Sequence, residues 1–266
     1  MIKAIAWVTF LDGIRNKAVY GITLLAGLMM AFTVVISGMI MRDVGKVATD
    51  FTLSAATFAA LLVVLFVGVT ILTRDMERKT VYLALSRAVP RGAYLLGRFV
   101  GLALLQGFII LILLAASLAT ILLVKQLYPS YFGKVSFGLI ILAHLFIMLQ
   151  MWLLTGLSML FSLVASSSFV TFLLTTLTWL IGSSTQAVKQ LVETAAPDRI
   201  SPAVKAIVQI AYYLFPNFAL FDLKTTAAHG LPIDGSRLLF SLLYAIGYAT
   251  VAIACAVMLF RKKELT

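Results

Sequence analysis

The sequence predicts an all-α polytopic membrane protein with six transmembrane helices, and three observations support this fold class. Of the 266 residues, 62% are hydrophobic and only 12% are charged, whereas soluble globular proteins carry roughly 45–50% apolar and about 25% charged residues. One core of this size cannot bury so many apolar side chains, so the chain requires lipid as a second apolar medium. The apolar stretches are also continuous and do not alternate, which favours helices over a membrane barrel.

Six stretches are long and apolar enough to cross a bilayer, which takes roughly 20 residues. The stretch 135–188 contains no Asp, Glu, Lys or Arg. It is too long for one span, so we expect two spans with a hinge near residues 166–168. The expected spans are 18–41, 51–73, 99–124, 135–164, 169–188 and 238–260. With their connections they form a single transmembrane domain over residues 1–266.

The basic residues predict the orientation of these spans. The N-terminal segment, the 74–98 loop and the C-terminal tail together hold 12 of the 21 Lys and Arg residues. Because Lys and Arg are enriched in cytoplasmic loops, and an even number of spans puts both ends on one side, we expect both termini in the cytoplasm and the chain in the cell (inner) membrane. Topology and contact with membrane lipids then explain the net charge of +11, and we expect no nucleic-acid partner.

No cleavable signal peptide is expected at the N-terminus, because no short apolar core with a small-residue cleavage site follows the first charges. The single cysteine, Cys255, excludes a disulfide scaffold and is interpreted as a packing residue. Residues 2–17 are predicted to form an amphipathic elbow helix in the headgroup plane, although a ragged extension of the first span remains an alternative. Its apolar face carries Trp7, Phe10, Leu11 and Ile14.

The outer segment 189–237 is interrupted by four prolines. Ser201-Pro202 predicts a helix start, with a hydroxyl cap followed by proline in the first turn, and Pro216 predicts the end of that helix. About 14 residues are too few to cross a bilayer. We therefore expect a short outer helix that rests on the bundle or at its interface, and no seventh span.

The segment 74–92 is predicted to form a short cytoplasmic helix between the second and third spans. Val81, Ala84, Leu85 and Ala88 fall on one helical face, the remaining surface is strongly basic, and Pro90 ends the helix. A partner protein could bind such a surface. A solvated loop that merely sets the topology is the alternative, and the residues alone leave both open.

The same segment resembles a conserved region in the membrane subunits of type-2 ATP-binding-cassette (ABC) exporters. The departures from the family pattern are Lys79, Ala88 and Arg98, where glycine, proline and lysine are usual. The matching residues are Glu77, Thr80, Ser86, Arg87, Val89, Arg91, Tyr94 and Gly97.

This resemblance implies a permease subunit of an ABC exporter, half of a homo- or heterodimer with a second permease chain. Each chain would dock a separate ATPase subunit through the coupling helix 74–92. The residues implied in ATPase coupling are Glu77, Arg78, Lys79, Thr80, Ser86, Arg87, Pro90 and Arg91. The sequence contains no G-x-x-x-x-G-K-[ST] phosphate loop. We therefore expect no catalytic residue and no bound cofactor in this chain, with ATP used by the partner subunit.

Two other classes remain as alternatives: a stand-alone secondary transporter or channel, and a membrane scaffold without a transport role. A gradient-driven transporter would place ionisable residues inside its spans, and here His144 is essentially alone. A serine-protease interpretation of His144 with Ser158 fails, because 14 residues of helix separate them by about 21 Å.

Small and polar residues at membrane depth suggest further contacts. Gly97 with Gly101, and Ala55 with Ala59, have the small-xxx-small spacing that permits close helix packing. Gln106, Gln150 and Gln186 are expected to bond to a neighbouring helix or, as the alternative, to line a pathway. The ten methionines could suit a soft metal, but apolar filler is the simpler interpretation, and we predict no metal site.

Overall fold

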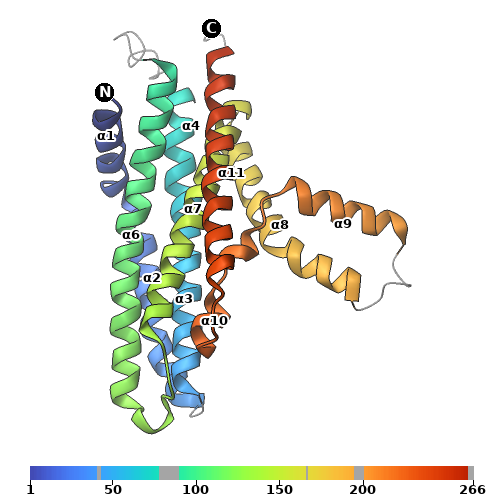
Figure 1. Ribbon diagram of the computed structural model, residues 1–266. Helices are drawn as coiled ribbons and strands as arrows, with labels where there is room; N and C mark the ends of the chain where they lie inside the picture. Colours follow the sequence, from blue (N-terminus) through green and yellow to red (C-terminus); the bar gives the residue numbers. More distant parts are fainter. Residues whose placement is uncertain (41–42, 78–89, 166, 195–200, 263–266) are drawn as a thin grey trace.

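A computed structural model of the chain describes residues 1–40, 43–77, 90–165, 167–194 and 201–262 (Figure 1). These residues are almost entirely helical, and no strand occurs among them. Six of their helices are long and apolar enough to cross a membrane, which confirms the predicted six-span, all-α class. The spans are α2 (Lys17–Ile40), α3 (Val44–Leu62) continued by η1 (Val63–Gly68) and α4 (Val69–Glu77), α6 (Arg91–Leu127), α7 (Phe137–Val164), α8 (Ser168–Thr194) and α11 (Gly235–Lys262).

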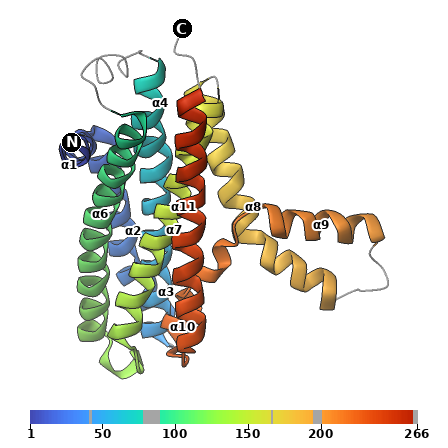
Figure 2. The ribbon, with the colours of Figure 1, turned by 45° about the horizontal axis from the view of Figure 1, so that its top comes forward.

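The spans form an elongated bundle with distinct ends. The start of α1 (Ile2–Ile14), the end of α4, the start of α6 and the end of α11 lie at one end, called here the termini end (Figure 1). The start of α3 and the short turn η2 (Pro129–Tyr131) lie at the opposite end, called the far end (Figure 2). The break between α7 and α8 falls at the hinge expected near residues 166–168.

The continuous span α3–η1–α4 occupies the centre of the bundle. In its most apolar 18-residue window, 67% of the residues are buried, compared with 17% in α11. The central helix contacts α2, α6, α7 and α10 (Lys224–His229), and its sixth turn is a π-helical segment, η1. Large apolar side chains on the outer helices are exposed, as expected for surfaces that face lipid. The central span is therefore the most enclosed of the six, although Phe58 and Phe66 stay exposed, whereas α11 is peripheral.

Several helices run beyond the apolar stretches that predicted them. The 37 residues of α6 correspond to a length of about 55 Å, well beyond the roughly 30 Å of hydrocarbon in a bilayer. The helix starts at Arg91, directly after Pro90. Pro90 itself is extended, with φ −59° and ψ 133°, and it occupies the N-cap position of α6. The excess length of α6 gives α1 a protein surface on which to pack at the termini end.

The outer segment forms a hairpin with the fifth span. The helix α9 (Pro202–Leu214) begins where Ser201-Pro202 predicted, and the Ser201 hydroxyl accepts a hydrogen bond from the amide of Val204 at 3.4 Å. None of its residues is buried. It packs along α8 and projects with it from the side of the bundle (Figures 1 and 2), so the first of the two expected positions, on the bundle rather than at its interface, is not observed. The chain then returns through η3 (Phe218–Phe221) and α10 to the far end.

Candidate functional site

Most of the expected coupling segment lies outside the described residues. This applies to Arg78, Lys79, Thr80, Ser86 and Arg87, to the seam from Val81 to Ala88, and to the side chain of Glu77. Pro90 and Arg91 are described. The geometry of the coupling site is therefore available where the segment enters α6.

Arg91 connects the start of α6 to the end of α11. Its guanidinium donates hydrogen bonds to the carbonyl oxygens of Phe260 at 2.9 Å and Arg261 at 3.1 Å, and it lies 5.8 Å from the centre of the Phe260 ring. The last carbonyls of a helix lack intrahelical partners and carry the negative end of its dipole. A cation at this position therefore stabilises the last turn of α11 and fixes it to the first residue of α6, near the end of the coupling segment.

Arg98, two turns further along α6, connects that helix to α1. Its guanidinium donates to the hydroxyls of Tyr94 at 3.2 Å and Thr9 at 3.1 Å and lies 3.9 Å from the carboxylate of Asp12. The family pattern usually has lysine here. A guanidinium presents five donors in a planar fork, so it can serve these partners from one position, which a lysine ammonium could not do in the same way.

Gly97 and Gly101 allow α1 to lie directly on α6. A Cβ added at Gly97 would meet Ile5 Cβ at 2.7 Å, and one added at Gly101 would meet Thr9 Cβ at 2.5 Å and the Ala6 oxygen at 2.6 Å. Real Cβ atoms do not approach other atoms so closely. The glycine pair is therefore a groove for α1 of the same chain.

The second small-residue pair lies in the central span. Ala55 is 1% exposed and Ala59 is 2% exposed, and both belong to the main apolar core. Their helix contacts α2, α6 and α7. This pair thus lies inside the bundle of a single chain.

The elbow residues divide between protein and exterior. Trp7 is 57% exposed and stacks on Phe10 at 5.4 Å between ring centres, and Phe10 meets Phe108 of α6 edge-on at 6.1 Å. Leu11 and Ile14 are half-buried. The residues that face α6 most completely are the small ones: Ala6, Thr9 and Gly13. Placement of Trp7 in the headgroup plane stays a prediction.

Two of the three membrane-depth glutamines bond to neighbouring segments. Gln106 of α6 donates to the Thr155 hydroxyl of α7 at 2.6 Å, and Gln186 of α8 accepts from the side-chain amide of Asn217 at 3.0 Å. Gln150 has no hydrogen bond within the described part of the chain and instead lines a cavity. Bonding to a neighbouring segment is thus observed for Gln106 and Gln186, and a pathway along Gln150 stays a prediction.

His144 makes a contact that the sequence did not indicate. Its Nε2 lies 3.2 Å from the hydroxyl of Ser117 on α6, and its Nδ1 lies 2.9 Å from the carbonyl oxygen of Ile140, which requires the proton on Nδ1. Ser158 donates to the carbonyl of Thr155, away from His144. The histidine therefore links two spans, and no spacing rule could have selected Ser117 as its partner.

No group of three or more His, Cys, Asp or Glu residues that could hold a metal occurs among the described residues. The methionines are scattered: Met30, Met151 and Met159 are fully buried, whereas Met29 and Met39 are exposed. The sulfur of Met30 lies 3.8 Å from the Ser117 hydroxyl, whose one proton can be given either to this sulfur or to His144. This distribution fits apolar packing.

These observations define a multi-pass α-helical membrane protein, in which α6, the helix that follows the 78–89 segment, is tied to α1 and α11. The family model of ABC-2 family transporter proteins matches residues 3–265, so the chain belongs to this family. It is a membrane component of an ABC transporter, separate from the ATPase, and membership implies an ABC ATPase subunit as its partner. The family that the coupling segment resembled is thereby confirmed. No curated protein matches the chain.

Proposed function

We propose that this chain is one permease half of an ABC exporter and that it is coupled to its ATPase through the 74–92 segment. In this proposal the termini end faces the cytoplasm of a cell whose inner membrane holds the spans. ATP is bound and hydrolysed by the partner ATPase, and a second permease chain completes the translocation pathway within the lipid bilayer. The proposed direction of transport is export, and it rests on the resemblance of the 74–92 segment to that of type-2 ABC exporters.

The observation that carries the proposal is the pair of helices that the segment joins. The segment leaves the central span through α4 and enters α6, whose first residue, Arg91, is bonded to the end of α11. A force applied to the segment would thus reach the centre of the bundle and its peripheral sixth span together. Transmission of a partner's movement as a rigid-body shift of packed helices is an established mode of conformational coupling.

The alternative of a gradient-driven transporter is less well supported. It calls for ionisable residues within the spans. Among the described residues, the one such side chain buried within a span is His144, in the third turn of α7, and both of its ring nitrogens are occupied by neutral partners. The family match also favours the ATP-driven class.

The test reverses charge on the coupling segment without disturbing the bundle. Because Arg91 holds the last turn of α11, its substitution would confound docking with folding. Arg78→Glu combined with Arg87→Glu avoids this contact. A matched control, Lys125→Glu with Lys134→Glu, makes the same charge change at the far end, where both lysines are exposed.

We expect the Arg78/Arg87 variant to reach the membrane at the normal level and to lose most of the ATPase that co-purifies with the unmodified chain. The loss of charge pairs at a protein interface costs about 2–5 kcal/mol when they are buried. The Lys125/Lys134 control should retain its ATPase. Equal recovery of the ATPase with both variants would rule out the segment as the docking site.

A further inference from the structure

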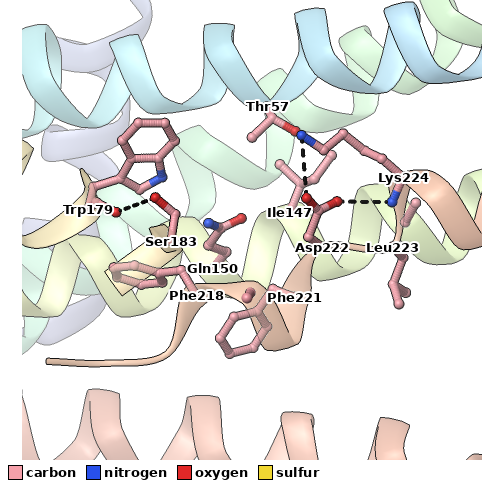
Figure 3. Close-up of a pocket in the computed structure, with 12 residues that line it drawn as sticks. Thr57, Ile147, Gln150, Trp179, Ser183, Phe218, Phe221, Asp222, Leu223 and Lys224 are labelled. Atoms are coloured by element: carbon pink, nitrogen blue, oxygen red, sulfur yellow. Dashed lines mark hydrogen bonds and ion pairs between the residues drawn. The ribbon is translucent and has the colours of Figure 1, made fainter. Parts of the chain in front are cut away.

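A cavity of about 190 Å³ lies between the central helix, α7, α8 and the returning segment from η3 to α10 (Figure 3). Its two ends differ in chemistry. Gln150 and Trp179 contribute to one end, and Asp222 and Lys224 contribute to the other (Figure 3). The walls include the rings of Phe218 and Phe221, which are almost completely buried. This cavity has no role in the ATPase coupling proposed above.

The Gln150–Trp179 end contains unused hydrogen-bonding groups. The indole nitrogen of Trp179 is buried and has no hydrogen-bond partner in the part of the chain that the structure describes. Gln150 is 6% exposed, and its side-chain amide has no hydrogen bond within the described residues, in contrast to Gln106 and Gln186. Leaving a buried donor unbonded costs about 1–3 kcal/mol, and the cost is not relieved by lipid. The unbonded amide of Gln150, on a nearly buried side chain that lines the cavity, therefore indicates an acceptor that occupies it.

The opposite end is polar and partly open. The Asp222 carboxylate lies 3.5 Å from the Lys224 ammonium, and these side chains are 50% and 28% exposed. The same carboxylate accepts a hydrogen bond from the Lys224 backbone amide at 3.0 Å. The pair has no net charge, and the other lining residues are neutral. An occupant with a net charge would thus find no counter-charge in the lining.

The size and the walls argue against an occupant consisting of water alone. A volume of 190 Å³ equals about six waters at their share of liquid volume, roughly 30 Å³ each. Each buried water needs two to four polar partners, but between its two polar ends the cavity is lined by Phe218, Phe221 and aliphatic side chains. An apolar cavity of about 150 Å³ is known to accept benzene. The volume therefore suits a single substituted ring or a body of similar size.

We propose that this cavity is a binding site for a small neutral amphiphile that carries a carbonyl oxygen, such as an aromatic amide. The carbonyl oxygen accepts a hydrogen bond from the Gln150 amide, the apolar body packs against the aromatic wall of Phe218 and Phe221, and any polar substituent meets the Asp222–Lys224 pair. Binding depends on this chain alone and needs neither ATP nor the docked ATPase. A failure of the coupling segment to bind an ATPase would leave this prediction unchanged.

The probe is 4-azidoacetanilide, a neutral photoactivatable aromatic amide, applied to the full chain in native membranes without ATP. We expect saturable labelling of peptides that contain residues 143–150, 179–183 and 218–224. Unlabelled acetanilide should compete, and n-propylbenzene, which has no acceptor, should compete far less. Labelling spread over the lipid-facing helices without saturation, or equal competition by the hydrocarbon, would show mere partitioning and overturn the proposal.

Two substitutions test the contacts. Gln150→Leu should raise the half-saturating probe concentration about tenfold, because one hydrogen bond to the carbonyl is lost. Thr57→Val is the matched control on the same lining: its hydroxyl is already donated to the Leu53 carbonyl at 2.8 Å, so the concentration should not change. An unchanged Gln150→Leu variant would refute the assignment. If that variant fails to reach the membrane, Ala219→Leu decides the matter, since it fills the cavity from η3 and must abolish saturable labelling.

Discussion

Substitution of Gly101 by alanine should detach α1 from α6. The new Cβ would lie 2.5 Å from Thr9 Cβ and 2.6 Å from the Ala6 oxygen, so α1 would have to move away from the helix on which it packs. Overpacking of this kind costs about 1–3 kcal/mol. The displaced helix would also lose the hydrogen bond from Arg98 to Thr9, worth about 1 kcal/mol.

A second glycine of the same helix serves as the control. A Cβ at Gly107 would meet only the sulfur of Met148, at an ordinary contact distance of 3.7 Å. Alanine raises helix propensity by about 1 kcal/mol at either position, so this gain cancels in the comparison. The Gly101→Ala chain should therefore be about 2–4 kcal/mol less stable than the Gly107→Ala chain.

Stability is measured by the resistance of the purified chain to SDS-induced unfolding in mixed micelles. Spin labels on α1 and α6 report the separation of the two helices in the folded state. We expect a longer distance in the Gly101→Ala chain alone. Equal stability of the two alanine chains, with the same distance between labels, would refute the packing argument.

Two further predictions concern the ends of the bundle. The first is tested with single cysteines in a Cys255→Ala background and a membrane-impermeant thiol reagent applied to intact cells. The reagent should label cysteines at the far end and spare those on the cytoplasmic side, because the loop charges predict that side to be enclosed by the cell. Labelling at position 87 in sealed cells would reverse the orientation. The test positions are 46, 134 and 224 at the far end, together with 87 and 263, which lie outside the described residues and which the loop charges predict to be cytoplasmic. A Cβ added at Gly92 would lie 3.3 Å from a methyl carbon of Val257. Cysteines at positions 92 and 257 should therefore form a disulfide. Arg91→Ala should slow the formation of this disulfide, because it frees the end of α11. If the disulfide forms at the same rate without Arg91, that side chain does not hold the two helices together.

The number and order of the spans could be predicted because each depends on a local property. A continuous apolar stretch of about 20 residues identifies a membrane helix wherever it occurs. The start of α9 was equally local, since Ser201 and Pro202 supply a cap and a first-turn proline within two residues. Helix ends were less well placed, because the polar residues at the ends of α6 continue the helix beyond the apolar stretch that marked it.

Contacts between distant residues could not be predicted in the same way. Arg91 and Phe260 are 169 residues apart, and nothing in either segment names the other as its partner. The roles of the glutamines also depended on packing, because Gln106 found Thr155 opposite it whereas Gln150 faces a cavity formed by four separate segments. One such contact did have a signal in the sequence. The spacing of Gly97 and Gly101 predicted a close helix contact, although it does not say which helix makes that contact.

The π-helical segment η1 acts as a phase shift in the central span. An α-helix turns by about 100° and rises 1.5 Å for every residue, whereas a π turn closes its hydrogen-bonded ring over one residue more. The faces of α4 are therefore offset from those of α3, and the two cannot be read as one periodic pattern. If the same residues formed a regular α-helix, the additional residue would rotate everything that follows by about 100° about the helix axis, whereas deletion of one residue between Val63 and Gly68 would leave the faces of α4 in place. The angular position from which the chain leaves the bundle after α4 thus depends on six residues inside the span.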